Sequence, residues 1–518
     1  MIIDLAIILT YFVVIMIIGI WSRAKSDVGV EEYFLSSRSL KWPYIAVSTI
    51  ATNIQANHFI AMAGSAYVFG LAQANLEINA IFGILIAAFV FVPIYLRMKV
   101  FTITQFFEAR LGPKVALTYS IFMIVLYSFM YLGTALFWAA YAANGVFGEL
   151  FDSIGLSVPV RLGILIIFTG AFSAAYTYMG GLRAVVRTDV VQFCLLVLGG
   201  FVILFVAIHH LGGWSELWNT TGDLMHLHLP SDHETLPWIG IFGMLLLNLN
   251  YWGANQVILQ RALAAEDLKQ AQIGLLVGGV LKYVMALIII VPGIALAGIL
   301  KDNPLKDPDL TYLTLVNDFL PVGVSGLILT GLFASLMSTL DSIYNSVSTL
   351  WSIDIYKRYL NPRATETQMV KAGRYSIMVS FIIGTLFAFI VIYVKFGNPE
   401  FPLTHWFNSM SYYIKISFVI IIMSAMFLYA PNRRLVLFTM LFSVVLTYIF
   451  QIGLPELNYF VRTTWVIVIC FLIIAVPTVI KYGFRLPGDR FFEVSHRSVL
   501  HFGIILALSL IGAHIIFH

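Results

Sequence analysis

Fourteen stretches of about 20 mostly apolar residues follow one another along this chain, and they limit its fold more than any other feature. A helix of about that length is needed to cross the hydrocarbon core of a bilayer. Charged residues make up only 11% of the 518 residues, whereas a soluble domain carries about 25%. We therefore predict an all-α integral membrane protein. The predicted transmembrane helices are residues 2–21, 43–67, 75–96, 117–146, 162–179, 187–209, 238–260, 271–300, 313–354, 373–394, 402–430, 435–452, 463–480 and 498–517.

The distribution of lysine and arginine tests this count and predicts the orientation of the spans. With the N-terminus outside, 23 of the 30 basic residues fall in inward loops, Arg261 among them, and five in outward loops. The remaining two, Lys282 and Lys415, fall within spans. A miscounted span would have scrambled this asymmetry further along the chain. We therefore expect a multi-pass protein of the cell membrane with both termini on the outer side.

Ionisable side chains within the predicted spans are candidate site residues. A charge in lipid is costly unless it is paired or hydrated, so each of them needs an explanation. Any one of them could belong to a structural pair that only locks two helices together. Taken together, and with the interrupted helices described next, they favour a transport pathway. These residues are His58, Glu77, Asp189, Lys282, Asp341 and Lys415.

Two predicted spans contain polar segments that indicate a broken helix. Residues 48–58 hold six Ser, Thr, Asn and Gln side chains and end at His58, and residues 248–256 form a second polar segment. Such side chains compete with the helical hydrogen bonds of the backbone. Non-helical backbone at membrane depth is tolerated only where it lines a cavity. Because the segments lie five spans apart, inverted five-helix repeats would place them opposite each other near the midplane.

Hydroxyl side chains share one face of the ninth predicted span. Ser335, Ser338 and Ser342 recur at helical spacing, with Thr339 alongside and Asp341 next to it. Clustered hydroxyls and a carboxylate are hard oxygen ligands that suit a hard cation. The alternative, that small residues only allow close helix packing, explains the serines but not Asp341.

Four motifs, spaced in order over nearly the whole chain, resemble the sodium/solute symporter family, and within it the sodium/glucose cotransporter branch. One motif is ATNI at 51–54 with HF at 58–59 and LEINA at 76–80. The others are GGLRAVVRTDVVQ at 180–192, NYWGANQ at 250–256 with QR at 260–261, and STLDS at 338–342 with DIY at 354–356. Four matches in order are far more specific than any single one.

The resemblance implies a LeuT-like core of two inverted five-helix repeats that works by alternating access. The corresponding division of the chain has a first peripheral span and inward loop, a first repeat, an outward loop, a second repeat and three peripheral spans. Their expected boundaries are 1–42, 43–209, 210–237, 238–430 and 431–518.

The resemblance also implies which residues bind sodium and the solute. By position, the first sodium would be held by the carbonyls of Ala51, Ile54 and Ser335 and the hydroxyls of Ser338 and Thr339. Some members carry a second sodium, which here would lie near Asp189, Ser338, Ser342 and Asp341. In the sugar branch the solute would meet Asn53, His58, Glu77, Asn248, Lys282 and Asn408, with Tyr251 stacking as an inner gate. One sodium ion or two are therefore expected as coupling ions.

The sequence departs from the family pattern at two places. Arg187 stands where many relatives have tryptophan. The eleventh span lacks the family's Ser-Pro-Gly break and reads YYIKIS at 412–417, so Lys415 has no family counterpart. Substrate identity is therefore less constrained by the resemblance than the fold or the coupling ion.

The charges of the expected site bear on the substrate. Glu77 and Lys282 cancel, and His58 is close to neutral at pH 7, which suits a neutral sugar. A carboxylate would prefer excess positive charge, which Lys415 could supply if it faces inward. We therefore predict a sodium-coupled symporter that imports a neutral sugar, with an inositol, sialic acid or monocarboxylate symporter as the alternative.

Proteins of other classes fit the sequence less well. A transport-derived sensor or a channel is a further alternative, but no appended signalling domain supports a sensor. The chain contains no His-Glu-x-x-His, nucleophile elbow or P-loop, so an enzyme is not expected. The expected partners are the small solute, sodium and the lipid bilayer, with no nucleic acid.

Overall fold

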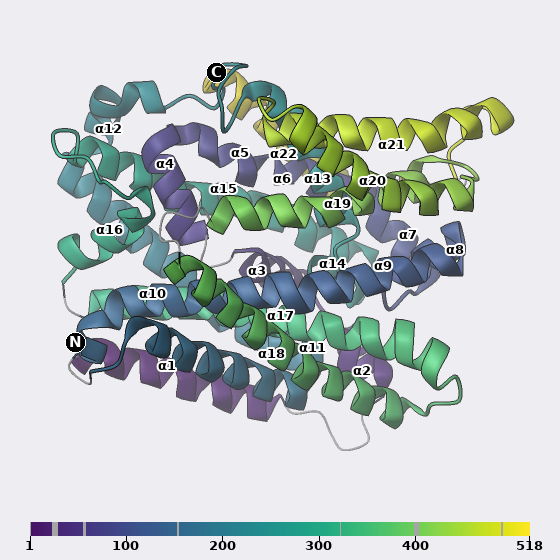
Figure 1. The fold of residues 1–518 in the computed structure, drawn as a ribbon, viewed down its shortest axis with the longest axis horizontal. Helices are drawn as coiled ribbons and strands as arrows, with labels where there is room; N and C mark the ends of the chain where they lie inside the picture. Colours follow the sequence, from purple (N-terminus) through teal and green to yellow (C-terminus); the bar gives the residue numbers. More distant parts are fainter. Residues whose placement is uncertain are drawn as a thin grey trace.

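The computed structural model describes residues 2–22, 29–54, 58–152, 155–321, 323–397, 403–487 and 491–518, and these are almost entirely helical (Figure 1). Within those ranges there is no β-strand, only isolated bridges between Leu40 and Ala265 and between Leu229 and Pro237. The α-helices are α1 (Ile2–Trp21), α2 (Val30–Leu35), α3 (Trp42–Asn53), α4 (Ala63–Phe69), α5 (Asn75–Ile78), α6 (Ala80–Ile86), α7 (Val92–Met98), α8 (Ile103–Leu111), α9 (Pro113–Val125), α10 (Leu132–Asp152), α11 (Val158–Leu211), α12 (Trp214–Thr221), α13 (Ile241–Gly253), α14 (Gln256–Leu263), α15 (Leu268–Ile299), α16 (Thr311–Phe319), α17 (Val324–Thr349), α18 (Glu366–Gly397), α19 (Leu403–Phe427), α20 (Arg433–Gly453), α21 (Tyr459–Tyr482) and α22 (Arg497–Ile516).

In the described residues, ten largely helical segments are long and apolar enough to cross a membrane. The predicted class, an all-α multi-pass membrane protein, is confirmed at this level. The number fourteen stays a prediction, because length and composition count the 54 residues of α11 once and pass over short or broken helices. The ten segments are His58–Met98, Pro113–Tyr141, Val158–Leu211, Leu268–Ile299, Val324–Leu360, Glu366–Phe396, Met410–Phe427, Arg433–Gly453, Tyr459–Tyr482 and Arg497–Ile516.

The long helix α11 consists of two arms that meet at Gly181. This glycine has φ 56° and ψ −151°, a conformation that residues with a Cβ rarely adopt. Near the middle of α1, Phe12 packs edge-on against Phe172 of the first arm, with ring centroids 4.9 Å apart. The adjacent Tyr11 accepts a hydrogen bond of 3.1 Å from Gln192 of the second arm. Since both arms lie against the same part of α1, the chain turns back between them.

Both polar segments interrupt their helices, as the sequence predicts. α3 ends at Asn53, and Ile54 is extended with φ −83° and ψ 110°. α13 ends at Gly253, and Asn255 is extended with φ −77° and ψ 112°. The Asn255 side chain accepts the N–H of Val257 and so caps the start of α14. The Asn255 side chain thus replaces a backbone acceptor at the second break, and at the first break the Ile54 carbonyl accepts a side-chain hydroxyl, that of Ser335.

The two chain ends lie toward the same end of the helix bundle. Figure 1 shows the N-terminus of α1 and the end of α22 toward the side that holds α12 and α16, whereas α2 and α8 lie at the other side. A Cβ on Gly323, just before α17, would lie 3.6 Å from Ile3. The N–H of Leu227, after α12, donates to the carbonyl of Phe517 over 2.7 Å. We call the side with α12 and α16 the α12 end, and the opposite side the α2 end.

α17 forms the centre of the bundle. It packs against α11, α18, α1 and α10, and nearly all of its residues are buried. α20 and α22 are mostly exposed, as expected for apolar helices that face lipid. The site described next lies beside α17, where α3 and α13 are interrupted.

Candidate functional site

A cavity of about 830 Å³ lies between the interrupted helices and opens toward the α12 end. Its lining includes Thr235 and the exposed Lys306, which lie in the connections at that end. On the other side of the break between α13 and α14, two buried tyrosines bond to free backbone carbonyls. Tyr95 donates to Gly253 over 2.6 Å, and Tyr119 donates to Ala254 over 2.5 Å. The cavity is therefore accessible from one end and closed by packed side chains at the other.

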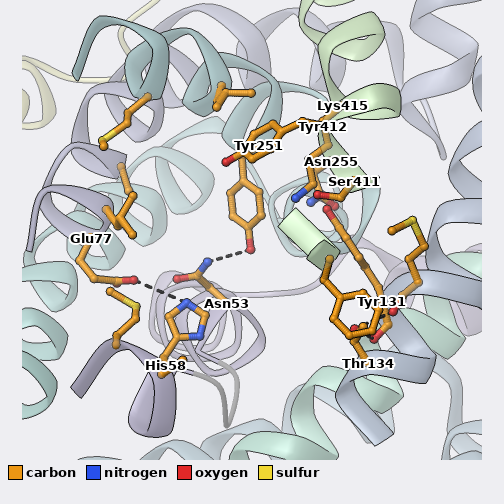
Figure 2. A pocket seen from close by; sticks show the side chains of 18 of the residues that line it. Asn53, His58, Glu77, Tyr131, Thr134, Tyr251, Asn255, Ser411, Tyr412 and Lys415 are labelled. Atoms are coloured by element: carbon orange, nitrogen blue, oxygen red, sulfur yellow. Dashed lines mark hydrogen bonds and ion pairs between the residues drawn. The ribbon is translucent and has the colours of Figure 1, made fainter. Parts of the chain in front are cut away.

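A buried ion pair forms one wall of the cavity. Lys282 Nζ on α15 lies 2.6 Å from Glu77 Oε2 on α5, and both side chains are almost fully buried. The same ammonium donates to Asn53 Oδ1 at the end of α3. The Asn53 amide in turn donates to the hydroxyl of Tyr251 on α13 over 2.8 Å (Figure 2). Four helices thus contribute one hydrogen-bonded network, which satisfies the polar groups that the fold buries.

His58 lies beside this network. Its Nε2 is 3.6 Å from Glu77 Oε1 (Figure 2). The other carboxylate oxygen of Glu77, Oε2, is the one that contacts Lys282. Asn248 also lines the cavity, and its amide donates to the carbonyl of Met244 over 3.0 Å. The side chain of Asn408 lies outside the described residues. Of the seven predicted solute residues, the structure brings the six others together around the cavity.

The residues predicted to hold the first sodium lie where the end of α3 meets α17. Ser335 donates its hydroxyl to the carbonyl of Ile54 over 2.6 Å, and Thr339 donates to the Ser335 carbonyl over 3.1 Å. Ala51 belongs to the last turn of α3, where helix carbonyls lack helical partners. All of these residues are buried, and Thr339 also lines the cavity. The donor set is made of neutral oxygens, which fits a hard monovalent cation.

Asp189, on the second arm of α11, is the centre of a fully buried polar cluster. Its Oδ1 accepts the hydroxyl of Ser338 over 2.5 Å, and its Oδ2 accepts the hydroxyl of Ser48. Arg261 Nη2 lies 3.4 Å from the same Oδ2, and neither side chain is exposed. Asp189 therefore has both hydrogen-bond donors and a positive charge, which a carboxylate away from water requires.

Asp341 lies close by on α17, but its contacts differ. Its Oδ2 accepts the hydroxyl of Tyr176 over 2.7 Å and that of Thr188 over 3.5 Å. Its Oδ1 lies 3.3 Å from the hydroxyl of Ser342. Within the described ranges, no lysine, arginine or histidine forms an ion pair with Asp341. The cluster thus holds two carboxylates and one guanidinium.

The position of Arg261 differs from the sequence-based expectation. The count of basic residues assigned it to an inward loop, but it lies on α14 with no exposed surface. Its guanidinium donates to Ser48 over 2.9 Å, to Thr52 over 2.8 Å and to Ser342. The break before α14 turns this short helix back into the protein, which a hydropathy count cannot register. Arg261 thus adds to this cluster a positive charge that belongs to the chain itself, and the second sodium stays a prediction.

Comparison with known proteins identifies the family. The profile of the Sodium:solute symporter family matches residues 33–442, which is most of the chain. The chain belongs to this family. The family resemblance inferred from the four motifs is thereby confirmed.

Individual relatives agree with this assignment. The symporter is 33% identical over 416 residues to a sodium/glucose cotransporter from Vibrio parahaemolyticus, with 74% of each chain covered. It is 31% identical over 430 residues to sodium/glucose cotransporter 1 from Ovis aries, covering 75% of this chain and 63% of that one. Sodium/myo-inositol cotransporter 2 from Mus musculus is 32% identical over 424 residues, and the match covers 75% of this chain and 61% of that one. The matched region thus spans less than two thirds of the two mammalian relatives.

The fold of the symporter is shared with a solved structure. A Na+-coupled sialic acid symporter in a substrate-bound outward-open state superposes with a TM-score of 0.76. The superposition covers 94% of this chain and 99% of that one, at 20% sequence identity. At this identity the likeness concerns the arrangement of helices.

Two residues of the symporter that depart from the family pattern have defined places in the structure. Lys415 on α19 lines the cavity, and its Nζ lies 5.3 Å from the ring centroids of both Tyr131 and Tyr412. Arg187, on the second arm of α11, donates to the hydroxyl of Ser22 over 3.3 Å, just after the end of α1. Arg187 thus ties α11 to α1, away from the cavity.

The cavity wall also contains residues that sequence reasoning did not assign to the site. They come from the π-helical stretch Leu126–Tyr131, from α10 and from α19, and include Tyr131, Thr134, Ser411 and Tyr412. Nothing in the sequence distinguishes these side chains from other polar groups in apolar helices. Asn255, also on the wall, lies within one of the family motifs and could have been found there.

Proposed function

We propose that this member of the family is a sodium-driven importer of a small polyhydroxylated solute, a sugar or a cyclitol. The observation that carries the proposal is the network of Glu77, Lys282, Asn53 and Tyr251 in the wall of a cavity open to the α12 end. Alternating donors and acceptors suit vicinal hydroxyl groups, since each hydroxyl both donates and accepts. Sodium/glucose and sodium/myo-inositol cotransporters among the relatives support the same solute class.

The roles of the individual residues follow from their contacts. Glu77 offers acceptor oxygens, Lys282 and Asn53 offer N–H donors, and Tyr251 covers the inner side of the solute as a stacking ring. His58, Asn248 and Asn408 complete the proposed set. When a solute hydroxyl is missing, these buried groups lose a partner, which makes such a site discriminate steeply.

The proposed first sodium site lies between α3 and α17, with the carbonyls of Ala51, Ile54 and Ser335 and the hydroxyls of Ser338 and Thr339 as ligands. When bound, the ion would join the broken end of α3 to α17 and so tie the solute-binding network to the centre of the bundle. Neutral ligands hold sodium without a full counter-charge, which suits an ion that must leave in every cycle. Thr339 lines the cavity as well, which provides a path for the ion.

A second cation is proposed near Asp189 and Asp341. Arg261 pairs with Asp189, so the cluster retains one carboxylate charge that no basic residue in the described part of the chain balances. Buried like charges repel unless a cation or proton lies between them. Ser338 and Ser342 would add hydroxyl ligands. A second sodium gives two sodium ions per solute, and a proton is the alternative.

The proposed topology has fourteen crossings, with both termini outside the cell membrane. Four crossings that length and composition do not count come from α1, from the second arm of α11, from the broken pair α3 and α4, and from the pair α13 and α14. The positions of both chain ends near α12 and α16 support an even number. On this basis the repeats would be 43–209 and 238–430, with 1–42, 210–237 and 431–518 around them.

The test is uptake of a radiolabelled panel of sugars and cyclitols into proteoliposomes, with and without an inward sodium gradient. The expected result is accumulation that requires the gradient and is abolished in Glu77→Ala. Glu456→Ala is the matched control, because Glu456 is exposed in the connection before α21 and does not line the cavity. Sodium-independent equilibration would favour a channel, and binding without uptake would favour a sensor. Either result would overturn the proposal.

A further inference from the structure

We propose that the solute carries a carboxylate, and that Lys415 is the residue that binds it. The substrate class would then be sugar acids, a polyhydroxylated skeleton with one carboxylate. This inference rests on the proposed function and narrows it. Two lysines, Lys282 and Lys415, lie in the membrane-embedded part of the cavity wall.

The two lysines differ in their partners. Lys282 Nζ lies 2.6 Å from a carboxylate oxygen of Glu77 and is almost fully buried. Lys415 is half-buried, lines the cavity, and forms no ion pair within the described ranges. Its ammonium instead lies over the faces of Tyr131 and Tyr412, with Nζ 5.3 Å from each ring centroid. Aromatic faces attract a cation but accept no N–H hydrogen bond of full strength, so the ammonium retains donors for a ligand.

The groups around Lys415 suit an anion. Figure 2 shows Thr134, Ser411 and Asn255 on the same wall as Lys415. The Asn255 carbonyl oxygen already accepts from Tyr127 over 2.6 Å and from a backbone N–H, so its NH2 group is the end that remains to donate. An amide N–H beside an ammonium suits a carboxylate. The Thr134 hydroxyl already donates to the Met130 carbonyl over 2.6 Å, so the Asn255 amide is the donor that the proposal uses. No carboxylate side chain contributes to this wall in the described residues.

The net charge of the cavity lining also favours an anionic solute. Among the described lining residues, four lysines (Lys282, Lys306, Lys395 and Lys415) stand against two carboxylates (Glu77 and Asp307). Lys306 and Asp307 lie near the mouth, and Lys395 lies in the last turn of α18. A cavity with an excess of one sign concentrates ligands of the other sign. The expectation of a neutral sugar rested on Glu77, Lys282 and His58 and left open whether Lys415 faces inward. Lys415 lines the cavity, so its charge is added to that sum.

The cavity therefore has two chemically different walls. Figure 2 shows Glu77, His58 and Asn53 on one side and Lys415, Ser411 and Tyr131 on the other, with Tyr251 between them. The first wall would bind ring hydroxyls, and the second would bind the carboxylate. A neutral hexose would form hydrogen bonds with Glu77, His58 and Asn53 on the first wall but would leave the Lys415 ammonium without a counter-charge.

The test compares two solutes that differ only at C6, D-glucuronate and D-glucose, in sodium-driven uptake by proteoliposomes. Wild-type protein is expected to have the lower KM for glucuronate. A charge-assisted contact is worth about 1.5–3 kcal/mol, so Lys415→Met should raise the KM for glucuronate by about 10- to 100-fold. Lys415→Met should therefore abolish or reverse the preference for glucuronate over glucose, and Lys415→Arg should keep it.

A control variant and a thermal-stability measurement distinguish a loss of glucuronate binding from a folding defect. Lys481→Met is the matched control, because Lys481 has the same kind of contact, 5.0 Å from the Tyr482 ring, but is exposed and outside the cavity. Glucuronate should raise the melting temperature of the wild type in sodium, and that of Lys415→Met much less. Sodium-driven glucose uptake without glucuronate uptake would overturn this inference and leave the proposed function standing. Absence of sodium-driven uptake across the whole sugar, cyclitol and sugar-acid panel would overturn both.

Discussion

Glu77→Gln would leave the Lys282 ammonium in the cavity wall without a carboxylate. The magnitude follows from the burial of the pair: the two side chains are 3% and 2% exposed and their charged atoms are 2.6 Å apart. Breaking a buried pair from one side costs about 3–5 kcal/mol, against at most about 1 kcal/mol for an exposed pair. Because Asn53 still accepts from Lys282 and the cavity admits water, we expect the lower end, a loss of about 3 kcal/mol in the free energy of unfolding.

A double-mutant cycle separates the pair from its surroundings. Unfolding would be followed by tryptophan fluorescence during SDS titration in mixed micelles, for Glu77→Gln, Lys282→Met and the double variant. Replacing a buried pair by neutral groups is often neutral or stabilising, so the double variant should regain most of the loss. Glu456→Gln, at an exposed position, should stay within about 0.5 kcal/mol of wild type. The reasoning is refuted if Glu77→Gln loses less than about 1 kcal/mol, or if the two single losses simply add.

Three further predictions concern the ion, the gate and the C-terminal contact. Thr339→Ala should raise the half-saturating sodium concentration by about tenfold or more, which corresponds to the loss of one charge-assisted contact. Thr330→Ala is the control: it loses a similar hydrogen bond to the backbone of the same helix and should leave the half-saturating sodium concentration unchanged. Tyr251→Phe removes the hydrogen bond that joins α13 to the end of α3, worth about 1 kcal/mol, so KM for the solute should rise about fivefold with kcat retained; an unchanged KM would exclude the tyrosine hydroxyl from the site. His228 stacks on His514, and burial, followed by the charge of His518, lowers the pKa of His228, so the docked contact favours the neutral form. Acidification through about pH 6.5 should therefore weaken this contact, seen as faster hydrogen exchange at both sites, and His228→Phe should remove the pH dependence.

The helix breaks and the main ion pair were accessible from the sequence because their signals are local. Asn53 and its polar neighbours compete with the helical ladder wherever the segment is placed, so the end of α3 could be predicted without tertiary information. Glu77 and Lys282 stood out because each is a charge in an apolar span, although nothing in the sequence paired them. Hydropathy also separated the two arms of α11, since the polar stretch around Gly181 divides two apolar runs.

Arg261 and Lys415 show what local signals could not supply. Arg261 follows an apolar run, where a basic residue usually marks the membrane surface, and only the turn of the chain before α14 brings it beside Asp189. The sequence showed Lys415 as an intramembrane charge. The direction of its side chain, however, depends on how α19 packs against α13, α20, α21 and the π-helical stretch Leu126–Tyr131. Partner choice between distant helices is a property of packing, and no spacing along one chain encodes it.

The position of Arg261 beside Asp189 affects which charges contribute to the transport current. A charge that belongs to the chain cannot dissociate, so the charge of Arg261 is carried in both directions during a full cycle and cancels from the steady-state current. An ion that balances Asp341 would be released on one side and would appear in the current. Two carboxylates within one cluster therefore need not mean two countable ions, and charge-to-solute ratios from reversal potentials report only the exchangeable part.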